Sequence, residues 1–341
     1  METRFSPLQT IVTGQRDYSF KTLLAAFEDQ FNDRLFPATP ATLYDAIDYA
    51  LGNGGKRVRP VLCLMGNALL APLELDAFLA ANAVELYHNF TLVHDDIMDR
   101  APLRRGRPTI HTRYNTSTAI LVGDTLQLYA FEYLNCMQGV HRQKVSAVFL
   151  EAALAVCEGQ QMDLDMEHMP LEAVCYPDYL TMITMKTSVL LAASLQMGAI
   201  IGGAGEEDQQ HLYAFGKNIG IAFQVQDDYL DAFGNPGQFG KQVGGDIITN
   251  KKTFLLLKAR ELCTPAQHAQ LQALLALPAG DTGKVPGVLQ LYRDCRVDEW
   301  AVREKQRFQQ IALQHLEQVA VPEENKKPLL ELADLLLNRG H

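Results

Sequence analysis

Two short clusters of aspartates are the residues of this sequence best suited to chemistry. Each is an Asp-Asp-x-x-Asp motif, and the six carboxylates are Asp95, Asp96, Asp99, Asp227, Asp228 and Asp231. Residues four apart share one face of a helix, so the first and last aspartates of each motif point the same way. Grouped carboxylates repel one another unless cations neutralise them, and Mg²⁺ usually binds through one or two carboxylates and substrate phosphates. One motif alone is typical of a solvated acidic helix end, but two copies favour metal binding.

Three basic segments in this acidic chain complement the aspartates. They are residues 55–60, residues 100–107, and the group of Lys241, Lys251 and Lys252. The guanidinium of arginine offers a planar pair of donors that matches phosphate oxygens. The second segment starts directly after Asp99 and includes the pair Arg104 and Arg105. Metal-binding carboxylates followed by paired arginines indicate a site for a diphosphate.

The elements that must position these residues are predicted to be helices throughout. Residues 84–93, 147–156 and 213–229 carry apolar side chains on most sides of a helix, which is typical of helices inside a large core. We find no convincing alternation of period two, so the predicted fold class is all-α. Because no break is a clear linker, we expect a single domain over residues 1–341. Its motifs lie within 54–252, and its C-terminal helices occupy 253–341.

Composition and charge narrow the class of protein. The 341 residues are 48% apolar, and 30 Lys and Arg against 40 Asp and Glu give a formal net charge of −10. This apolar fraction excludes a disordered chain, which could not offset the entropy of folding. The acidic total argues against a nucleic-acid partner, because a nucleic-acid binder needs a basic surface to neutralise phosphates.

The cysteines and the most apolar stretch bear on the compartment. Six scattered cysteines form no CxxC pair, which favours free thiols in a reducing compartment. The first twenty residues lack the apolar core of a secretory signal. The uncharged stretch Ser188–Gly205 includes serine, glutamine and four glycines, so we interpret it as a buried helix rather than a membrane span. We therefore expect a cytoplasmic protein without a membrane anchor.

Together the motifs resemble those of the trans-isoprenyl diphosphate synthases, the polyprenyl synthetase family, and its short-chain geranylgeranyl and farnesyl diphosphate synthase type. The resemblance rests on Gly-Gly-Lys-Arg-Val-Arg-Pro (54–60), Asp-Asp-Ile-Met-Asp (95–99), Arg-Arg-Gly (104–106), Gly-Gln-Gln-Met-Asp-Leu (159–164), Lys-Thr (186–187), Phe-Gln-Val-Gln-Asp-Asp-Tyr-Leu-Asp (223–231) and Gly-Lys followed by Gly-Asp and Lys within 240–251. It implies a single large helical bundle of the isoprenoid synthase type around a central apolar cavity, with the aspartate motifs facing each other across its mouth. It also implies a homodimer.

The resemblance further implies a role for each motif residue. Mg²⁺, three ions per active site, would be held by Asp95, Asp99 and Asp227, while Asp96, Asp228 and Asp231 would support metal or water. The allylic diphosphate would be contacted by Arg104, Lys186, Gln224, Lys241 and Lys251. Isopentenyl diphosphate would be held by Lys56, Arg59, His88 and Arg105. Thr187 and Gln224 would lie near the developing carbocation, although ordinary helix packing remains the alternative for both, as a core position does for His88.

The implied activity is that of a Mg²⁺-dependent prenyltransferase of isoprenoid biosynthesis, which condenses isopentenyl diphosphate head-to-tail with an allylic diphosphate. Metal ions, lysines and arginines would stabilise the departing diphosphate, and an apolar cavity would keep water from the carbocation. A class I terpene cyclase is one alternative, but such an enzyme has no second diphosphate substrate for Lys56, Arg59 and Arg105 to bind. A non-catalytic subunit of a heteromeric prenyl synthase is another, but it would be expected to carry a degraded aspartate motif.

The resemblance also implies that residues just before the first motif set the length of the product. Phe90 lies five positions before Asp95, about 7.5 Å along an ideal helix and about 140° around it. In this family, an aromatic residue at the position of Phe90 forms the floor of the pocket for the growing chain. The neighbouring residue, Thr91, is small. We therefore expect a C20 product, geranylgeranyl diphosphate, with C15 farnesyl diphosphate as the next candidate. An ordinary core aromatic is the alternative interpretation of Phe90.

Overall fold

The computed structural model describes residues 18–33, 36–234 and 244–337. It is 78% helical, which confirms the all-α prediction. The chain groups into two compact units, the first made of residues 1–150, 193–212 and 320–328, and the second of residues 151–192, 213–319 and 329–341. The single domain expected from the sequence stays a prediction.

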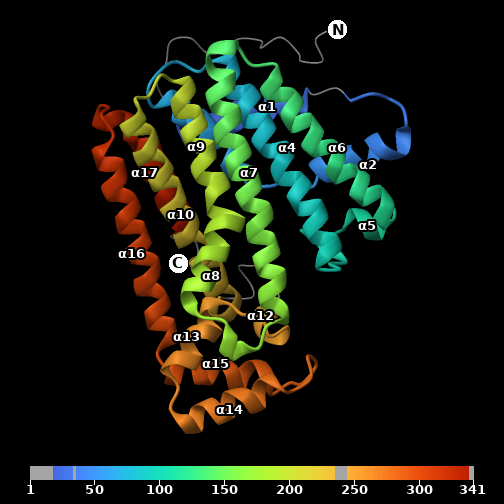
Figure 1. Cartoon of the computed structure of the whole chain (residues 1–341), viewed down its shortest axis with the longest axis vertical. Coiled ribbons are helices and arrows are strands. Elements are labelled where there is room, and N and C mark those ends of the chain that lie inside the picture. The colour runs from blue at the N-terminus through green and yellow to red at the C-terminus, as the bar shows by residue number, and fades with distance from the viewer. Residues whose placement is uncertain (1–17, 34–35, 235–243, 338–341) are drawn as a thin grey trace. The chain divides into compact units, whose positions relative to one another are not determined.

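The first unit is built around the long helix α4. It contains α1 (Phe20–Asn32), α2 (Ala41–Leu51), α3 (Val58–Ala68), α4 (Leu75–Met98), α5 (Ile110–Arg113), α6 (Thr116–Asn135), and parts of α7 (Gly139–His168), α9 (Val189–Ile201), α10 (Glu206–Phe233) and α17 (Glu323–Leu337). Helix α4 packs most extensively against α6 and α3, and Figure 1 shows α4 and α6 side by side. Its residues from Asp76 to Tyr87 are all buried, which explains why the sequence is apolar on most sides there.

A small hairpin directly follows α4. Strands β1 (Leu103–Arg104) and β2 (Arg107–Pro108) pair antiparallel, and the two residues between them, Arg105 and Gly106, have φ of 51° and 75°. Two consecutive left-handed residues make a type I′ turn, for which glycine is well suited and arginine is not. This hairpin is not predicted from the sequence, because its strands are too short to show alternation.

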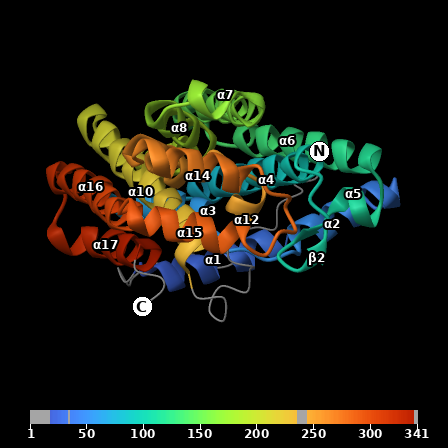
Figure 2. The same ribbon diagram turned by 90° about the horizontal axis from the view of Figure 1, so that it is seen from below.

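The second unit contains the remaining helices. They are η1 (Leu171–Ala173), α8 (Tyr176–Ile183), η2 (Thr184–Ser188), α12 (Gly245–Ile248), α13 (Phe254–Leu262), α14 (Pro265–Leu275), α15 (Lys284–Asp294) and α16 (Val297–Gln318), with the other parts of α7, α9, α10 and α17. Figure 2 shows α14 beside α15. The rings of Tyr179, Phe254 and Trp300 pack in sequence in its core, with centroids 5.9 and 5.7 Å apart.

The apolar stretch that raised the question of a membrane span lies within a longer helical run. By length and composition, residues Tyr176–Ile201 could cross a membrane, but 72% of the most apolar window is buried inside the structure. Burial of this extent is typical of a core helix and agrees with the interpretation made from the sequence.

Candidate active site

The first aspartate motif forms the end of α4 in the first unit. Asp95 is half-buried, and Asp99 is exposed and caps the helix. Asp96 is buried instead, and its Oδ1 accepts hydrogen bonds from Nε and Nη2 of Arg104, both at 2.8 Å. Burial raises the pKa of Asp96, and the Arg104 charge partly offsets that rise. The predicted metal residues therefore lie toward solvent, while the middle aspartate fastens the hairpin to α4.

The second motif lies near the end of α10 in the second unit. Asp227 is exposed, whereas Asp228 is buried and accepts hydrogen bonds from the Tyr179 hydroxyl and from Gln224 Nε2, the latter at 2.8 Å. Burial raises the pKa of the Asp228 carboxyl to about 7, against the opposing charge of Lys251. The middle aspartate thus has neutral hydrogen-bond donors in place of an arginine.

The last aspartate of the second motif supports the backbone. Oδ2 of Asp231 accepts a hydrogen bond from the backbone nitrogen of Asp246 at 3.0 Å, and its carbonyl accepts one from Gly244 at 2.7 Å. Lys251 follows α12 and lines a small cavity together with Asp228, Asp231 and Asp246. Asp231 therefore holds the start of α12 and, through it, the segment that carries Lys251. Lys241 lies outside the described residues.

Lys186 and Thr187 lie in η2, a single π-helical turn between α8 and α9. Such turns are rare and often occur at functional sites. Lys186 Nζ pairs with Asp163 Oδ2 of α7 at 2.6 Å. One turn earlier on α7, Gly159 lies so close to η2 that a Cβ there would be 2.3 Å from the Lys186 nitrogen. The glycine and the aspartate of the Gly-Gln-Gln-Met-Asp-Leu motif thus position Lys186, a role that the sequence alone did not indicate.

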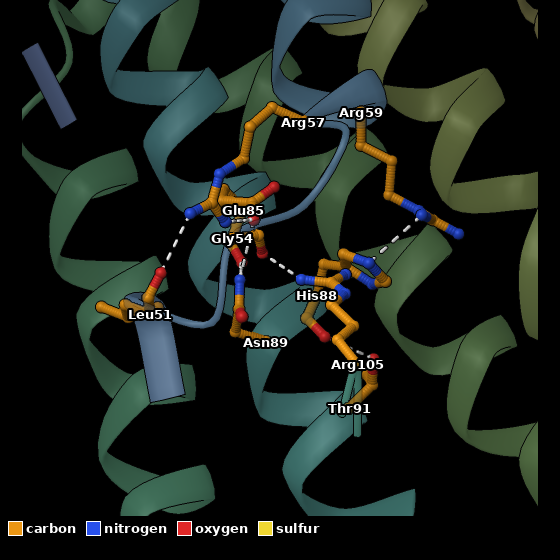
Figure 3. Close-up of polar contacts among 9 residues, drawn as sticks. All are labelled: Leu51, Gly54, Arg57, Arg59, Glu85, His88, Asn89, Thr91 and Arg105. Carbon is orange, nitrogen blue, oxygen red and sulfur yellow. Dashed lines mark hydrogen bonds and ion pairs between the residues drawn. The ribbon is translucent and has the colours of Figure 1, made fainter. Parts of the chain in front are cut away.

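A concentration of arginines surrounds His88 in the first unit (Figure 3). His88 Nε2 lies 3.3 Å from Arg59 Nη1, and since arginine only donates, the histidine nitrogen accepts. Desolvation, followed by the charges of Arg59, Arg105, Arg104 and Arg57, holds the pKa of His88 well below its usual value. Burial lowers the pKa of Arg59 to about 10, and its Nε has no hydrogen-bond partner among the described residues. Several partly desolvated cations around a neutral histidine form a site suited to an anion.

The hairpin and the glycine loop complete this basic site. Arg105, at the tip of the hairpin, donates from Nη1 to the carbonyl oxygen of Gly54. Lys56 is exposed two residues later in the same loop. The structure therefore brings together Arg59, His88 and Arg105, and it places Lys56 in the loop that Arg105 contacts.

The two residues expected to set product length lie on different flanks of α4. Phe90 is buried, with its ring centroid 5.2 Å from that of Tyr87 and 4.9 Å from that of His94. Thr91 is half-buried, and its hydroxyl donates to the carbonyl oxygen of His88 at 2.8 Å. Thr91 shares its face with Asp95, four residues on, as helix geometry requires. The roles of both residues in product length stay predictions.

The aspartates suit Mg²⁺ in the kind of ligand that they offer. No group of three or more His, Cys, Asp or Glu side chains that could hold a metal by itself occurs among the described residues. Mg²⁺ does not need such a cage, because it usually binds through one or two carboxylates together with substrate phosphates and water. The carboxylates of Asp95, Asp99 and Asp227 fit that ligand set.

Comparisons with known proteins agree with these motifs. A sequence model of the Polyprenyl synthetase family matches residues 40–292. The geranylgeranyl pyrophosphate synthase of Geoglobus acetivorans is 36% identical over 315 residues, covering 92% of this chain and 96% of that protein. The geranylfarnesyl diphosphate synthase of Natronomonas pharaonis is 34% identical, covering 89% of this chain and 91% of its own. The crystal structure of geranylgeranyl pyrophosphate synthetase from Pyrococcus horikoshii superposes with a TM-score of 0.86 at 32% identity, covering 94% of this chain and 99% of that one.

Proposed function

This chain belongs to the polyprenyl synthetase family and is a prenyltransferase, and we propose that it condenses isopentenyl diphosphate head-to-tail with an allylic diphosphate. The observation that carries the choice of substrates is the basic site around His88. There, Arg59 and Arg105 lie beside a neutral histidine, and a buried guanidinium nitrogen of Arg59 lacks a partner among the described residues. A second diphosphate-binding site is what distinguishes a chain-extending synthase from an enzyme with one diphosphate substrate.

The proposed mechanism follows the development of charge. Asp95, Asp99 and Asp227 would hold Mg²⁺, three ions per active site, which when bound neutralises the departing diphosphate. Lys186, oriented by Asp163, acts with Arg104, Gln224, Lys241 and Lys251 on that same allylic diphosphate. Lys56, Arg59, His88 and Arg105 hold isopentenyl diphosphate so that its double bond meets the allylic carbon. The allylic carbon–oxygen bond breaks with Thr187 and Gln224 near the developing carbocation, a new carbon–carbon bond forms to isopentenyl diphosphate, and the extended cation loses a proton to the released diphosphate.

One incubation tests this function. Purified chain is mixed with Mg²⁺, labelled isopentenyl diphosphate and an allylic diphosphate, and the products are separated by chain length. Longer prenyl diphosphates are the expected result. A hydrocarbon formed without isopentenyl diphosphate would indicate a terpene cyclase, and the absence of turnover would indicate a non-catalytic subunit of a heteromeric synthase.

For the product we propose C20 geranylgeranyl diphosphate. The buried ring of Phe90, the small neighbour Thr91 and the relatives named as geranylgeranyl synthases support it, although other relatives are named geranylfarnesyl synthases. Replacing Phe90 with alanine should yield products longer than those of the wild type, because it opens space next to the chain. A folded, active Phe90→Ala variant whose longest product is unchanged would remove Phe90 from the pocket floor.

We also propose a cytoplasmic homodimer whose contact face is the outer side of α6. Leu121, Leu128 and Phe131 are 56%, 69% and 37% exposed there and share one face of the helix. An adjacent groove is lined by Glu132 and by Arg142 of α7. Around a two-fold axis the same patch occurs twice, so Glu132 of one copy can meet Arg142 of the other. Light scattering should show a dimer for the wild type and a monomer for Leu128→Glu, and a monomeric wild type would contradict the proposal.

A further inference from the structure

One arginine of the basic segment 55–60 points away from solvent. The side chain of Arg57 is 7% exposed and forms an ion pair with Glu85 of α4, whose side chain is 4% exposed (Figure 3). Its Nη2 donates to the carbonyl oxygen of Leu51, the last residue of α2, at 3.0 Å. Arg57 is thus buried between two helices and does not share the anion-facing position of its neighbours in the sequence.

The acidic partner of Arg57 is itself held in place. Asn89, one turn later on α4, donates from Nδ2 to Glu85 Oε1 and to the Glu85 carbonyl oxygen, both at 2.8 Å. A buried carboxylate is tolerated when a cation and further donors satisfy it, and Glu85 has both. Arg57, Glu85 and Asn89 therefore form one buried network, which we call the Arg57 network.

The backbone at Arg57 is left-handed, which arginine rarely adopts. Its φ is 47°, and it occupies the position immediately before α3. Non-glycine residues keep such a conformation only where their surroundings impose it, and such positions cluster at functional sites. Here Glu85 and the Leu51 carbonyl oxygen hold the Arg57 side chain, and the bend separates Lys56, on the loop, from Arg59, on the first turn of α3.

We propose that Arg57, Glu85 and Asn89 are positioning residues for the isopentenyl diphosphate site, an inference that rests on the proposed function. Side chains tie the loop from Leu51 to Arg57 at three carbonyl oxygens, that of Leu51 by Arg57, that of Gly52 by Arg107 and that of Gly54 by Arg105. The network fixes the loop that carries Lys56 and the start of the helix that carries Arg59. It also pairs the carboxylate of Glu85, which would otherwise leave an unpaired negative charge close to the arginines that receive the diphosphate.

A double variant separates positioning from mere stabilisation. Arg57→Met with Glu85→Leu removes both charges, and a buried ion pair replaced by apolar residues often leaves stability unchanged or improved. If the network positions the site, this folded variant should still need about tenfold more isopentenyl diphosphate for half-maximal rate, since small misplacements near a reacting group are costly. The requirement for the allylic diphosphate should stay within about twofold of wild type. Arg57→Lys keeps the charge but not the hydrogen-bond geometry, so its requirement for isopentenyl diphosphate should fall between those of the wild type and the double variant.

A matched control uses another buried, hydrogen-bonded carboxylate on the same helix. Asp76 of α4 pairs with His141 Nδ1 at 2.9 Å, and its side chain is also 4% exposed. Asp76→Asn should lower the melting temperature without changing the requirement for isopentenyl diphosphate. A double variant with wild-type values for both substrates would overturn the proposal, as would an equal loss for both.

Binding provides a readout that does not depend on turnover. Titration calorimetry with inorganic diphosphate should show weaker binding to the double variant than to wild type and to Asp76→Asn. A wild-type chain without turnover would refute the proposed function, and this titration would then still test whether the Arg57 network positions the site. Equal binding by the wild type, the double variant and Asp76→Asn would overturn the positioning role.

Discussion

The two aspartate motifs share their spacing and their place at the end of a helix, yet their middle residues are satisfied in different ways. In the first unit Asp96 is paired with a charged arginine. In the second unit Asp228 is buried with a tyrosine hydroxyl and a glutamine amide, and burial raises its pKa to about 7. Burial raises the pKa of both carboxyls, and the charge of Arg104 at Asp96 and of Lys251 at Asp228 offsets part of that rise.

The last residues of the two motifs differ as well. Asp99 is exposed at the end of α4, whereas Asp231 accepts a hydrogen bond from the backbone of α12. In the first motif Asp95 is half-buried and Asp99 exposed, and in the second Asp227 is exposed while Asp231 is half-buried. Identical spacing in sequence thus produces different exposure, because different elements pack against the two motifs.

The largest effect on turnover should come from replacing Asp95 or Asp227. Asp95→Ala and Asp227→Ala should each lower turnover by at least about 10²-fold, because each removes a ligand of the cations that stabilise the leaving group. Steady-state rates with saturating Mg²⁺ measure this, and circular dichroism checks the fold. Near-normal turnover in either folded variant would break the comparison and the functional assignment.

A smaller effect, specific to one substrate, should follow changes in the basic residues. Lys56→Ala and Arg59→Ala should raise the Michaelis constant for isopentenyl diphosphate about tenfold, because each removes one charged contact to it. Lys241→Ala should act mainly on the allylic substrate. Kinetics with each substrate varied in turn test this, and equal weakening of both substrates by every variant would show that the two sites are not separate.

The smallest effect concerns the middle aspartates and sharpens the comparison itself. Asp96→Asn should cost about 1–3 kcal/mol of unfolding free energy, because it leaves Arg104 without its charged partner. Asp228→Asn should cost less than about 1 kcal/mol, since the Tyr179 hydroxyl can both donate and accept and a carboxyl with a pKa of about 7 is only partly ionised at neutral pH. Urea unfolding of both variants without Mg²⁺ measures the difference. A larger loss for Asp228→Asn than for Asp96→Asn would reverse our account of the two motifs.

Much of the fold follows from local patterns. All-round apolar helices predict an all-α protein with a large core, and the buried length of α4 confirms it. The hairpin and the π-helical turn η2 were not predicted. Both are only a few residues long, and each depends on contacts with other elements, Gly54 for the hairpin and Gly159 for η2.

For the site, the sequence by itself determined the kinds of ligand and their spacing. Four-residue intervals put Asp95 and Asp99 on one face of α4, and the motif order identified the family. Only the tertiary structure decided which aspartates are exposed and which are buried and hydrogen-bonded to other elements. Tyr179 lies 49 positions from Asp228, and Glu85 lies 28 positions from Arg57. Partners so far apart in the chain meet only when their helices pack, and burial then raises the pKa of the Asp228 carboxyl.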